Sequence, residues 1–371
     1  MALLPIAAEA HARLLASDPP PGATLSSAPD QVTLFFSEAV TPAGRGISVY
    51  GPDGRLLTSA AARGSGSQLT ATFAAEAEGT YVIVFTVVSS DTHPSRGNLT
   101  FNVGRATTPR APGLGSGDVG LVSPLGLVLQ AIGRWLHFAG YALGFGAGTY
   151  ALIVARTAAL RLSGLGIVLL LASEPVSLLA QTASLDPAQT FDGDALAGML
   201  GSSFGRVFGL QTGLALLLWA VFGALSQAGW LRWAVPALGA AMAVVDSFAA
   251  HPVPALPALA AAILVALHAG AMGMWVGGLV GFMTAPVLAF GRLAGWSAAL
   301  LVLSGAALAL LHFASPGQLL TTAYGVILLV KLPLVAAALV LGWVGRRRWE
   351  LLAAALVIAV AGVLVSLPPP R

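Results

Sequence analysis

The feature that most constrains the fold of this chain is a series of long apolar runs that begins near residue 125 and continues almost to the C-terminus. A helix needs about 20 mostly apolar residues to cross the hydrocarbon core of a bilayer, and each run reaches that length. The runs predict an all-α polytopic membrane domain over residues 122–371, with about eight transmembrane helices. The expected spans are 125–154, 162–182, 206–227, 231–250, 257–285, 293–313, 320–343 and 350–368.

The composition agrees with a chain that lies mostly in a lipid bilayer. Hydrophobic residues make up 57% of the 371 positions and charged residues only 9%, whereas soluble domains carry about 25% charged residues. The net charge of +3 comes from few residues, so we expect no nucleic-acid partner. Cysteine is absent, which excludes both a disulfide framework and a thiolate metal site.

The arginines of the membrane domain gather in alternate connections between the expected spans. If the N-terminal domain is exported, these connections face the cytoplasm, as the positive-inside rule requires. We therefore expect a multi-pass protein whose N-terminal domain lies on the outer side, with the C-terminus returned to that side by an even number of spans. The arginines concerned are Arg156, Arg161, Arg232, Arg292, Arg346, Arg347 and Arg348.

Residues 11–104 have a different pattern, with short runs of β-branched and aromatic residues between turn residues. The turn Pro52-Asp53-Gly54 separates two of the runs, and the run 81–88 is so apolar that we expect it to be central in its sheet. With one or two further strands, the pattern predicts a small all-β sandwich of the Ig-like or Greek-key type. The strands expected are 31–36, 46–50, 69–73, 79–88 and 98–103.

A segment rich in Gly, Pro, Ser and Thr follows the predicted sandwich and lacks apolar periodicity. We interpret residues 105–121 as a flexible linker that keeps the sandwich close to the membrane. At the other end of the sandwich, residues 1–10 are expected to be a remnant or short signal peptide, because Ala8-Glu9-Ala10 is the small-x-small pattern after which signal peptidase cuts. Cleavage there would make His11 the first residue of the mature chain.

A candidate metal site combines this N-terminus with the pair Asp91 and His93. In an extended segment, side chains two residues apart share a face, so these two can present an oxygen and a nitrogen to one ion. The α-amine and imidazole of His11 would complete a nitrogen and oxygen set that suits Cu(II) and could also take zinc. A polar strand end is the alternative for Asp91 and His93, and Glu38 either supports the site or is a solvated carboxylate.

Four histidines lie within or beside the expected spans, where ionisable side chains are costly and often mark a pathway or a site. The topology places all four in the outer half of the membrane, with ordinary packing as the alternative role. Met272 follows His268 by four residues, which would offer a thioether and an imidazole to Cu(I) on one helix face. The candidate metal ligands are His137, His251, His268, Met272 and His312.

Four charged side chains also lie inside the spans and are expensive there unless they are paired. We expect Glu174 or Asp246 to form an ion pair with Arg134 or with Lys331, the only lysine of the chain. The sequence leaves the choice of partners open.

The motifs of the first domain occur together in a known family. They are His11-Ala12-Arg13-Leu14, Ser17-Asp18-Pro19 with Gly22-Ala23, Val32-Thr33-Leu34-Phe35-Phe36-Ser37-Glu38, and Ser90-Asp91-Thr92-His93-Pro94 with Gly97 and Phe101. With these motifs, residues 11–104 resemble the periplasmic copper-resistance protein CopC, and the resemblance implies a sandwich that binds Cu(II) through His11 with its amine, Asp91 and His93. The methionines that bind Cu(I) in some family members are absent from this domain.

The membrane domain also carries a set of motifs that occur together in a known family. They are Ser247 and His251, Leu267-His268-Ala269, Trp275-Val276-Gly277-Gly278-Leu279, Ser304-Gly305, Tyr324-Gly325, Leu328-Leu329 and Lys331-Leu332. With these residues, the domain resembles the copper-resistance membrane protein CopD over roughly residues 125–368. Gly345 departs from that pattern, in which we expect an asparagine before Arg346.

Both resemblances together imply a fused copper protein of the bacterial cytoplasmic (inner) membrane, with its N-terminal domain in the periplasm. The leading hypothesis is that the sandwich captures Cu(II) and hands copper to intramembrane His and Met sites, where Cu(I) is also an option, for import or for copper tolerance. The chain has no ATP-binding P-loop motif, and we expect no enzymatic activity. Two alternatives remain, a haem- or quinone-linked membrane copper reductase and a non-transporting copper buffer or sensor.

Overall fold

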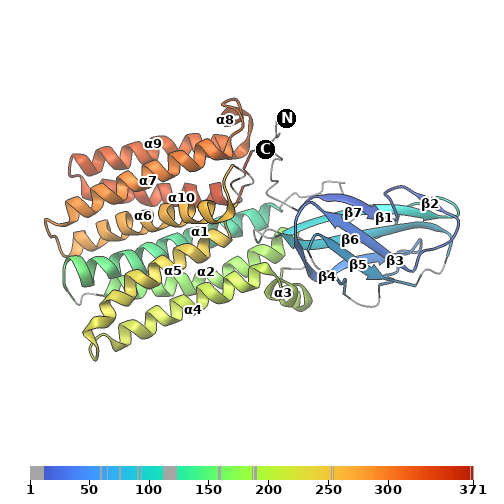
Figure 1. Cartoon of the computed structure of the whole chain (residues 1–371), viewed down its shortest axis with the longest axis horizontal. Coiled ribbons are helices and arrows are strands. Elements are labelled where there is room, and N and C mark those ends of the chain that lie inside the picture. Colours follow the sequence, from blue (N-terminus) through green and yellow to red (C-terminus); the bar gives the residue numbers. More distant parts are fainter. Residues whose placement is uncertain are drawn as a thin grey trace. The chain divides into compact units, whose positions relative to one another are not determined.

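The chain folds into two compact units in this computed structural model. Among the described residues, one unit combines those from Ala12 up to Gly126 with the segment 178–206 and holds the β-strands, whereas the other combines 127–177 with 207–370 and holds most of the helices (Figure 1). The structure describes residues 12–58, 61–64, 66–74, 77–89, 92, 94–111, 123–157, 160–185, 187, 190–251, 253, 255–367 and 369–370.

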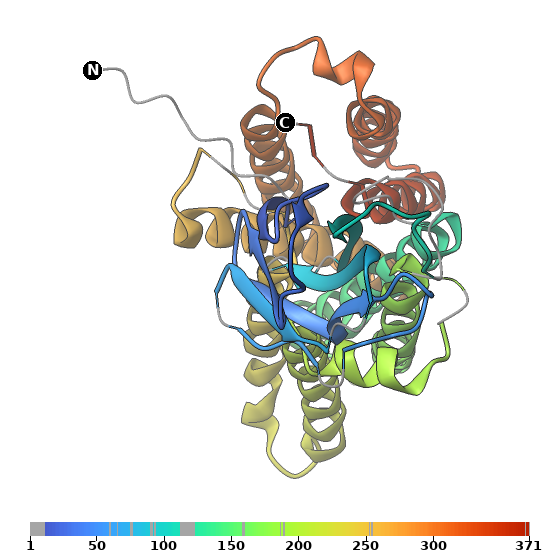
Figure 2. The same ribbon diagram turned by 90° about the vertical axis from the view of Figure 1, so that its right-hand side faces the viewer.

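The strand-rich unit contains two sheets, which Figure 2 views nearly along their strands. A three-stranded sheet has the order β1-β3-β5, and a four-stranded sheet has the order β2-β7-β6-β4. The pairs are antiparallel except for β2, which runs parallel to β7. The described strands are β1 (Leu14–Asp18), β2 (Thr24–Leu25), β3 (Gln31–Phe36), β4 (Val40–Tyr50), β5 (Gln68–Thr72), β6 (Gly79–Ser89) and β7 (Pro94–Val103).

The two sheets enclose one hydrophobic core. Val32, Leu34 and Phe36 alternate along β3 and all point into it. The ring of Phe36 meets the edge of Phe85 on β6, with 5.5 Å between the ring centroids, so that aromatic side chains of both sheets interlock. Burial of a side chain of this size contributes roughly 1.5–3 kcal/mol. The predicted all-β sandwich is therefore confirmed.

Most of the predicted strands occur where the sequence pattern placed them. β6 lies between β7 and β4, which confirms that the apolar run 81–88 is central in its sheet. The turn 52–54 is also present, with Gly54 at a φ of 84° that favours glycine. β1 and β2 are the strands that the sequence did not place, because β2 has only two residues and both are edge strands with little periodic signal.

The described part of the predicted linker is attached to the sandwich. The backbone N–H of Thr107 donates to the hydroxyl of Thr80 at 2.8 Å, and that hydroxyl donates to the carbonyl of Thr107 at 2.7 Å. The N–H of Thr80 also donates to the Thr107 hydroxyl at 2.9 Å. The packed part of the sandwich thus extends beyond Gly104, while residues 112–121 of the linker lie outside the described residues.

The strand-rich unit also includes a short helix, α3 (Gly193–Leu200), that packs against β4. The side chain of Asp192 caps this helix by accepting a hydrogen bond from the N–H of Ala195 at 2.9 Å. Within the same unit, the hydroxyl of Ser203 donates to the carbonyl of Ser89 at 2.8 Å. The sequence did not predict that residues 178–206 would pack with the strands.

Seven described helical segments are long and apolar enough to cross a membrane. They correspond to seven of the predicted spans and confirm a multi-pass helical fold. They are α2 (Arg161–Leu185), α4 (Ser203–Ala224), η4 (Gly229–Trp233) continued by α5 (Ala234–Phe248), α6 (Ala258–Thr284), α7 (Phe290–His312), α9 (Ala323–Trp343) and α10 (Arg347–Val365), with the short α8 (Gln318–Thr321) between α7 and α9.

The first predicted span, 125–154, differs from the other seven. It folds as α1 (Pro124–Tyr141) followed by two π-helical stretches, η1 (Ala142–Ala147) and η2 (Tyr150–Val154). The polar side chains of Gln130, Arg134 and His137 lower the hydropathy of α1, which explains why length and composition alone do not select it. Wide π-turns of this kind are frequent at functional sites.

Glycines allow α6 to approach η1 closely. A Cβ atom on Gly277 would overlap the carbonyl oxygen of Ala142, and one on Gly146 would overlap the carbonyl oxygen of Gly273. Small residues at such contacts let the backbones of membrane helices pack together. This packing fixes the first span against α6 in the centre of the helical unit.

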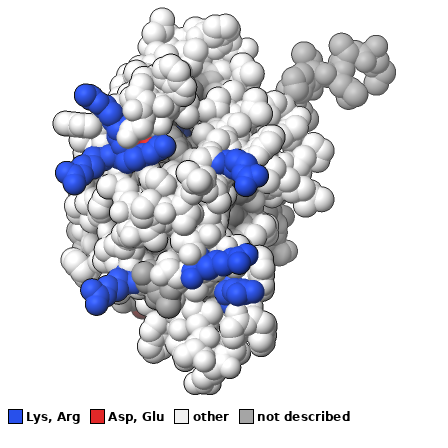
Figure 3. Space-filling view, turned by 90° about the vertical axis from the view of Figure 1, so that its left-hand side faces the viewer, with Lys and Arg blue, Asp and Glu red and all other residues white. Residues whose placement is uncertain are grey.

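The predicted grouping of the arginines is visible in the helical unit. Figure 3 shows basic side chains gathered on one end face, and Figure 1 shows that the connections η2–α2, α4–α5, α6–α7 and α9–α10 all lie at that end. Six of the seven arginines in these connections are exposed, and Arg347 is half-buried. We call this face the arginine end, and its residues are Arg156, Arg161, Arg232, Arg292, Arg346, Arg347 and Arg348.

Candidate metal-binding sites

The three residues of the predicted Cu(II) site, His11, Asp91 and His93, lie outside the described residues. Their described neighbours nevertheless meet at one end of the sandwich. The N–H of Ser37 donates to the carbonyl of Arg13 at 2.9 Å, which brings the start of the described chain beside the connection between β3 and β4. At the far side of that connection, Val40 pairs with Ser89, the last residue of β6.

Thr92, between the two predicted ligands Asp91 and His93, has an unusual backbone conformation. Its φ is 70°, in the left-handed region that a β-branched residue rarely adopts. Its side chain is buried, with only 2% of the residue exposed. A residue held in this region costs roughly 1–3 kcal/mol, and such residues cluster at functional sites. Thr92 is therefore a constrained position between the two predicted ligands.

Glu38 lies in the connection between β3 and β4, at the same end of the sandwich. It is half-buried, so it is not a fully solvated carboxylate. Its position is compatible with the supporting role that the sequence suggested.

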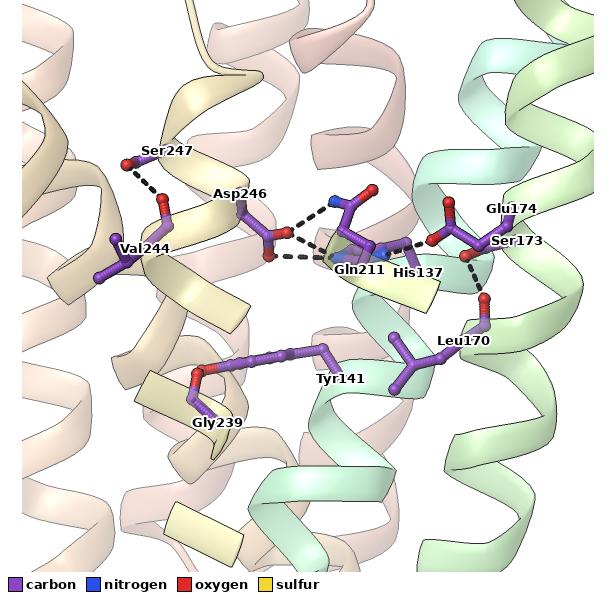
Figure 4. Close-up of polar contacts among 10 residues, drawn as sticks. All are labelled: His137, Tyr141, Leu170, Ser173, Glu174, Gln211, Gly239, Val244, Asp246 and Ser247. Carbon is purple, nitrogen blue, oxygen red and sulfur yellow. Dashed lines mark hydrogen bonds and ion pairs between the residues drawn. The ribbon is translucent and has the colours of Figure 1, made fainter. Parts of the chain in front are cut away.

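In the helical unit, polar side chains from four helices meet around His137, as Figure 4 shows. His137 comes from α1, Glu174 from α2, Gln211 from α4 and Asp246 from α5. The ring of His137 lies between the two carboxylates: Nε2 is 3.1 Å from each oxygen of Asp246, and Nδ1 is 4.0 Å from Oε1 of Glu174. All three side chains are at least about nine-tenths buried, with exposed fractions of 7%, 7% and 11%.

The cluster is held by further hydrogen bonds. Gln211 donates its amide N–H to Oδ1 of Asp246 at 2.8 Å. Tyr141, one turn after His137, donates its hydroxyl to the carbonyl of Gly239 at 3.0 Å and so connects α1 to α5. Figure 4 shows Tyr141 and Gly239 in the same view as the contacts of His137. The cluster is therefore an ordered polar site inside an apolar bundle.

These contacts show which side chains lie next to Asp246. Asp246 contacts His137 and Gln211, so its closest partner is not one of the expected cations Lys331 and Arg134. The expected pairing of Glu174 with Arg134 stays a prediction. Lys331 has no ion-pair partner among the residues that the structure describes.

A second polar site lies around His268 on α6. Its Nδ1 is 2.9 Å from the hydroxyl of Ser304 on α7. That hydroxyl has one hydrogen, which it donates to the carbonyl of Leu300 at 2.6 Å, so it can only accept from His268. Nδ1 of His268 therefore carries the hydrogen, and Nε2 presents its lone pair. The positive charge of Lys331 on α9 also acts on this ring.

The remaining membrane candidates lie elsewhere. His312, at the end of α7, donates from Nδ1 to the carbonyl of Leu308 at 2.7 Å, so its Nε2 also presents a lone pair. His251 is buried just after the end of α5. Met272 packs against apolar side chains of two core clusters, which agrees with a packing role.

No three His, Asp or Glu side chains converge on a point that could hold a metal ion, within the part of the chain that the structure describes. The five membrane candidates are distributed over several positions instead of forming one site. Their role as metal ligands stays a prediction.

Sequence reasoning missed two residues that these sites use, Gln211 and Ser304. Both are polar residues inside apolar runs, which is a usable signal, although many serines in membrane helices only bond their own backbone. It also missed a buried carboxylate near the arginine end, Glu350. Its Oε2 accepts from Arg347 at 2.7 Å, and its Oε1 accepts from the indole N–H of Trp275 at 3.3 Å.

Comparisons with known proteins match both halves of the chain. A family model described as the CopC domain matches residues 14–104, and one described as Copper resistance protein D matches residues 285–356. Protein YobA of Escherichia coli K12 is 34% identical over 98 residues, which cover 25% of this chain and 79% of YobA, and Protein YobA of Shigella flexneri gives the same values.

Solved structures similar to this chain include CopC and PcoC. CopC from Methylosinus trichosporium OB3b is 28% identical, covers 29% of this chain and 100% of its own, and has a TM-score of 0.24. The copper resistance protein PcoC from Escherichia coli is 28% identical, covers 24% of this chain and 98% of its own, and has a TM-score of 0.21.

Proposed function

This chain belongs to the copper-resistance family, with a CopC domain followed by a CopD region, and from this premise we propose how its two halves act on copper. The family relationship indicates copper binding and the handling of copper at a membrane. In the proposal, the sandwich captures Cu(II) outside the cytoplasmic membrane and passes copper to histidines of the helical unit, for import or for copper tolerance. Copper is the cargo of this protein.

The observation that carries the capture step is the meeting of three chain segments at one end of the sandwich. The segments are the start of the described chain at Ala12, the β3–β4 connection and the end of β6 at Ser89. They flank His11, Glu38, and Asp91 with His93 respectively. An amine, two imidazoles and a carboxylate from these segments would give the nitrogen and oxygen set that suits Cu(II).

Two features of the helical unit support a transport step. The polar sites around His137 and His268 are buried in different helix sets, and each holds an imidazole in one tautomer by hydrogen bonds. Sites with few ligands bind with moderate affinity, which conduction requires because an ion must leave as well as enter. The tether between sandwich and helices raises the local concentration of the donor.

The proposed orientation rests on the arginine end. Seven arginines lie at this end of the helical unit, and an arginine excess is typical of the cytoplasmic side. The sandwich would then lie in the periplasm, and copper would enter the bundle from the end that carries His251 and His312.

The alternatives remain weaker. A haem-linked reductase would need histidines that face one another as axial ligands, but His137 and His268 contact different helices. A buffer or sensor would bind copper without moving it, so a transport measurement separates it from the proposal.

The first experiment expresses the chain with a full signal peptide and sequences the mature N-terminus. Electron paramagnetic resonance then compares Cu(II) bound to the parent, to His11→Ala and to Asp91→Asn. Asp53→Asn is the matched control, because Asp53 lies in the turn at the other end of the sandwich. We expect both site variants to lose the nitrogen-rich Cu(II) signal of the sandwich and the control to keep it.

The transport step is tested with the purified chain in sealed vesicles loaded with a copper chelator. The proposal predicts copper uptake that falls when the sandwich ligands are replaced. Unchanged Cu(II) spectra in both site variants would overturn the capture step, whereas tight binding without any uptake would favour a buffer or sensor.

A further inference from the structure

The His137 ring stands between carboxylates of two other helices, and each ring nitrogen faces one of them (Figure 4). On one side, Nε2 is within hydrogen-bond distance of Asp246, at 3.1 Å. On the other side, Nδ1 and Oε1 of Glu174 are 4.0 Å apart, which is too far for a hydrogen bond. Nε2 is therefore hydrogen-bonded to a carboxylate, whereas Nδ1 only faces one.

The contact with Asp246 determines the tautomer of the ring. An ionised carboxylate can only accept hydrogen bonds, and Asp246 already accepts one from Gln211. Nε2 of His137 must therefore donate, so in the neutral ring Nδ1 carries a lone pair. This lone pair faces Glu174, whose carboxylate oxygens are also acceptors. In this neutral form, a nitrogen lone pair and a carboxylate oxygen face each other across a gap of 4.0 Å.

The gap has the size of a bound metal ion. Imidazole nitrogens and carboxylate oxygens bind ions such as Zn(II) at about 2.0–2.2 Å, so an ion between two such ligands separates them by up to roughly 4 Å. We propose that Nδ1 of His137 and the carboxylate of Glu174 bind one copper ion between them, with Asp246 and Gln211 as positioning residues. The sequence suggested His137 as a ligand but gave Glu174 only an ion-pair role.

The two positioning residues act through the ring. Asp246 holds Nε2–H and so directs the lone pair of Nδ1 toward Glu174, while Gln211 holds Asp246 at 2.8 Å. Carboxylates that orient a ligating histidine through its other nitrogen are a regular feature of metal sites, and their loss typically costs 10–100-fold in metal affinity. Four helices, α1, α2, α4 and α5, thus converge on one ion.

The donor set points to the oxidation state. One imidazole nitrogen and one carboxylate oxygen suit Cu(II) better than Cu(I), which prefers thiolate and thioether ligands. Only two side chains contact the ion, since Asp246 faces the opposite nitrogen, and this agrees with the lack of a three-residue metal group among the described residues. The inference rests on the proposed function and adds that copper enters the helices as Cu(II).

The test uses the full chain in lipid nanodiscs, with His11, Asp91 and His93 all changed to Ala so that only membrane sites remain. Cu(II) is titrated in, and bound copper and its resonance spectrum are recorded for this background and for His137→Gln, Glu174→Gln and Asp246→Asn. Glu350→Gln is the matched control, because Glu350 is an equally buried acid in a different helix set.

We expect His137→Gln to remove the imidazole nitrogen signal of the His137 site. Glu174→Gln should keep a nitrogen signal but lower the affinity at least tenfold, and Asp246→Asn should lower it by a smaller factor. Glu350→Gln should match the background. If Glu174→Gln does not fold, as judged by circular dichroism, Glu174→Asp keeps the charge on a shorter side chain and should bind more weakly with the same ligands.

Unchanged affinity in Glu174→Gln together with loss in His137→Gln would overturn the role of Glu174 and leave the transport proposal intact. Copper binding that is unchanged in all three variants, or absent from the background, would overturn the His137 site altogether. The capture step is judged separately, from the spectra of the chain with an intact sandwich.

Discussion

At the scale of single residues, the buried polar side chains of the helical unit are used in pairs that their positions in the sequence do not suggest. His137 and Asp246 are 109 residues apart, and His268 and Ser304 are 36 apart. In each pair, one hydrogen bond fixes which ring nitrogen is free. Because a neutral imidazole binds a metal only through its bare nitrogen, these bonds decide the direction in which each histidine can bind copper.

Ser304 offers a test of this idea at the second histidine. Ser304→Ala removes the acceptor of the Nδ1–H of His268, so the ring loses its fixed tautomer. We expect copper affinity at the membrane sites to fall about tenfold, measured by titration of the nanodisc sample without sandwich ligands. Ser304→Thr keeps the hydroxyl and should retain most of the affinity. An equal loss in both variants would mean that packing around Ser304, and not its hydrogen bond, matters.

Glu350 has a structural role near the arginine end. Its carboxylate is 2% exposed and accepts from both Arg347 and Trp275. Glu350→Leu leaves the two donors without an acceptor, so we expect the free energy of unfolding to fall by about 1–3 kcal/mol. Denaturant unfolding in detergent measures this loss. Glu350→Gln keeps an acceptor for Trp275 and should lose less; a larger loss than in Glu350→Leu would contradict the assignment.

At the scale of elements, the first span is less apolar than the other spans but packs closely against α6. α1 carries three polar side chains and continues as π-helix, yet its η1 segment lies against α6 with backbone atoms in contact. The glycines of both segments make this approach possible, and the approach places His137 of α1 among α2, α4 and α5.

Gly277→Ala tests the contact between α6 and η1. Its Cβ atom would overlap backbone atoms of Ala142 and Ala147, so the helices must separate. We expect a loss of about 1–3 kcal/mol in the free energy of unfolding and weaker copper binding at His137. The matched control is Gly209→Ala in α4, where a Cβ meets nothing within 4 Å and the higher helix propensity of alanine should leave stability equal or improved. Equal effects in both variants would contradict the packing argument.

At the scale of the whole molecule, the proposed function depends on the orientation in the membrane. The chain has no cysteine, so single cysteines can be introduced without a background. Ser226 and Ser315 are both exposed, the first in the connection after α4 and the second after α7. In the proposed orientation, Ser315→Cys faces the periplasm and Ser226→Cys faces the cytoplasm.

We expect a membrane-impermeant maleimide to label Ser315→Cys in intact cells and Ser226→Cys only after the cells are permeabilised. Labelling in the reverse order would place the arginine end outside and would require copper to move in the opposite sense through the same sites.

The sequence by itself determined the two kinds of fold in this protein. Strand alternation in residues 31–36 and apolar runs of about 20 residues depend only on near neighbours along the chain, so the sandwich, its central strand and seven spans could be predicted. The residue types of the candidate sites were also visible, because a histidine or carboxylate inside an apolar run is unusual wherever it lies.

Only the tertiary structure decided how these residues are used. The partner of Asp246, the tautomers of His137 and His268, and the meeting of Ala12, Val40 and Ser89 at one end of the sandwich all depend on contacts between segments far apart in the sequence. The short β2 and the π-helical continuation of α1 likewise arise from packing against neighbouring elements. Such contacts depend on how the surfaces of distant segments fit together, and a local sequence pattern does not predict that fit.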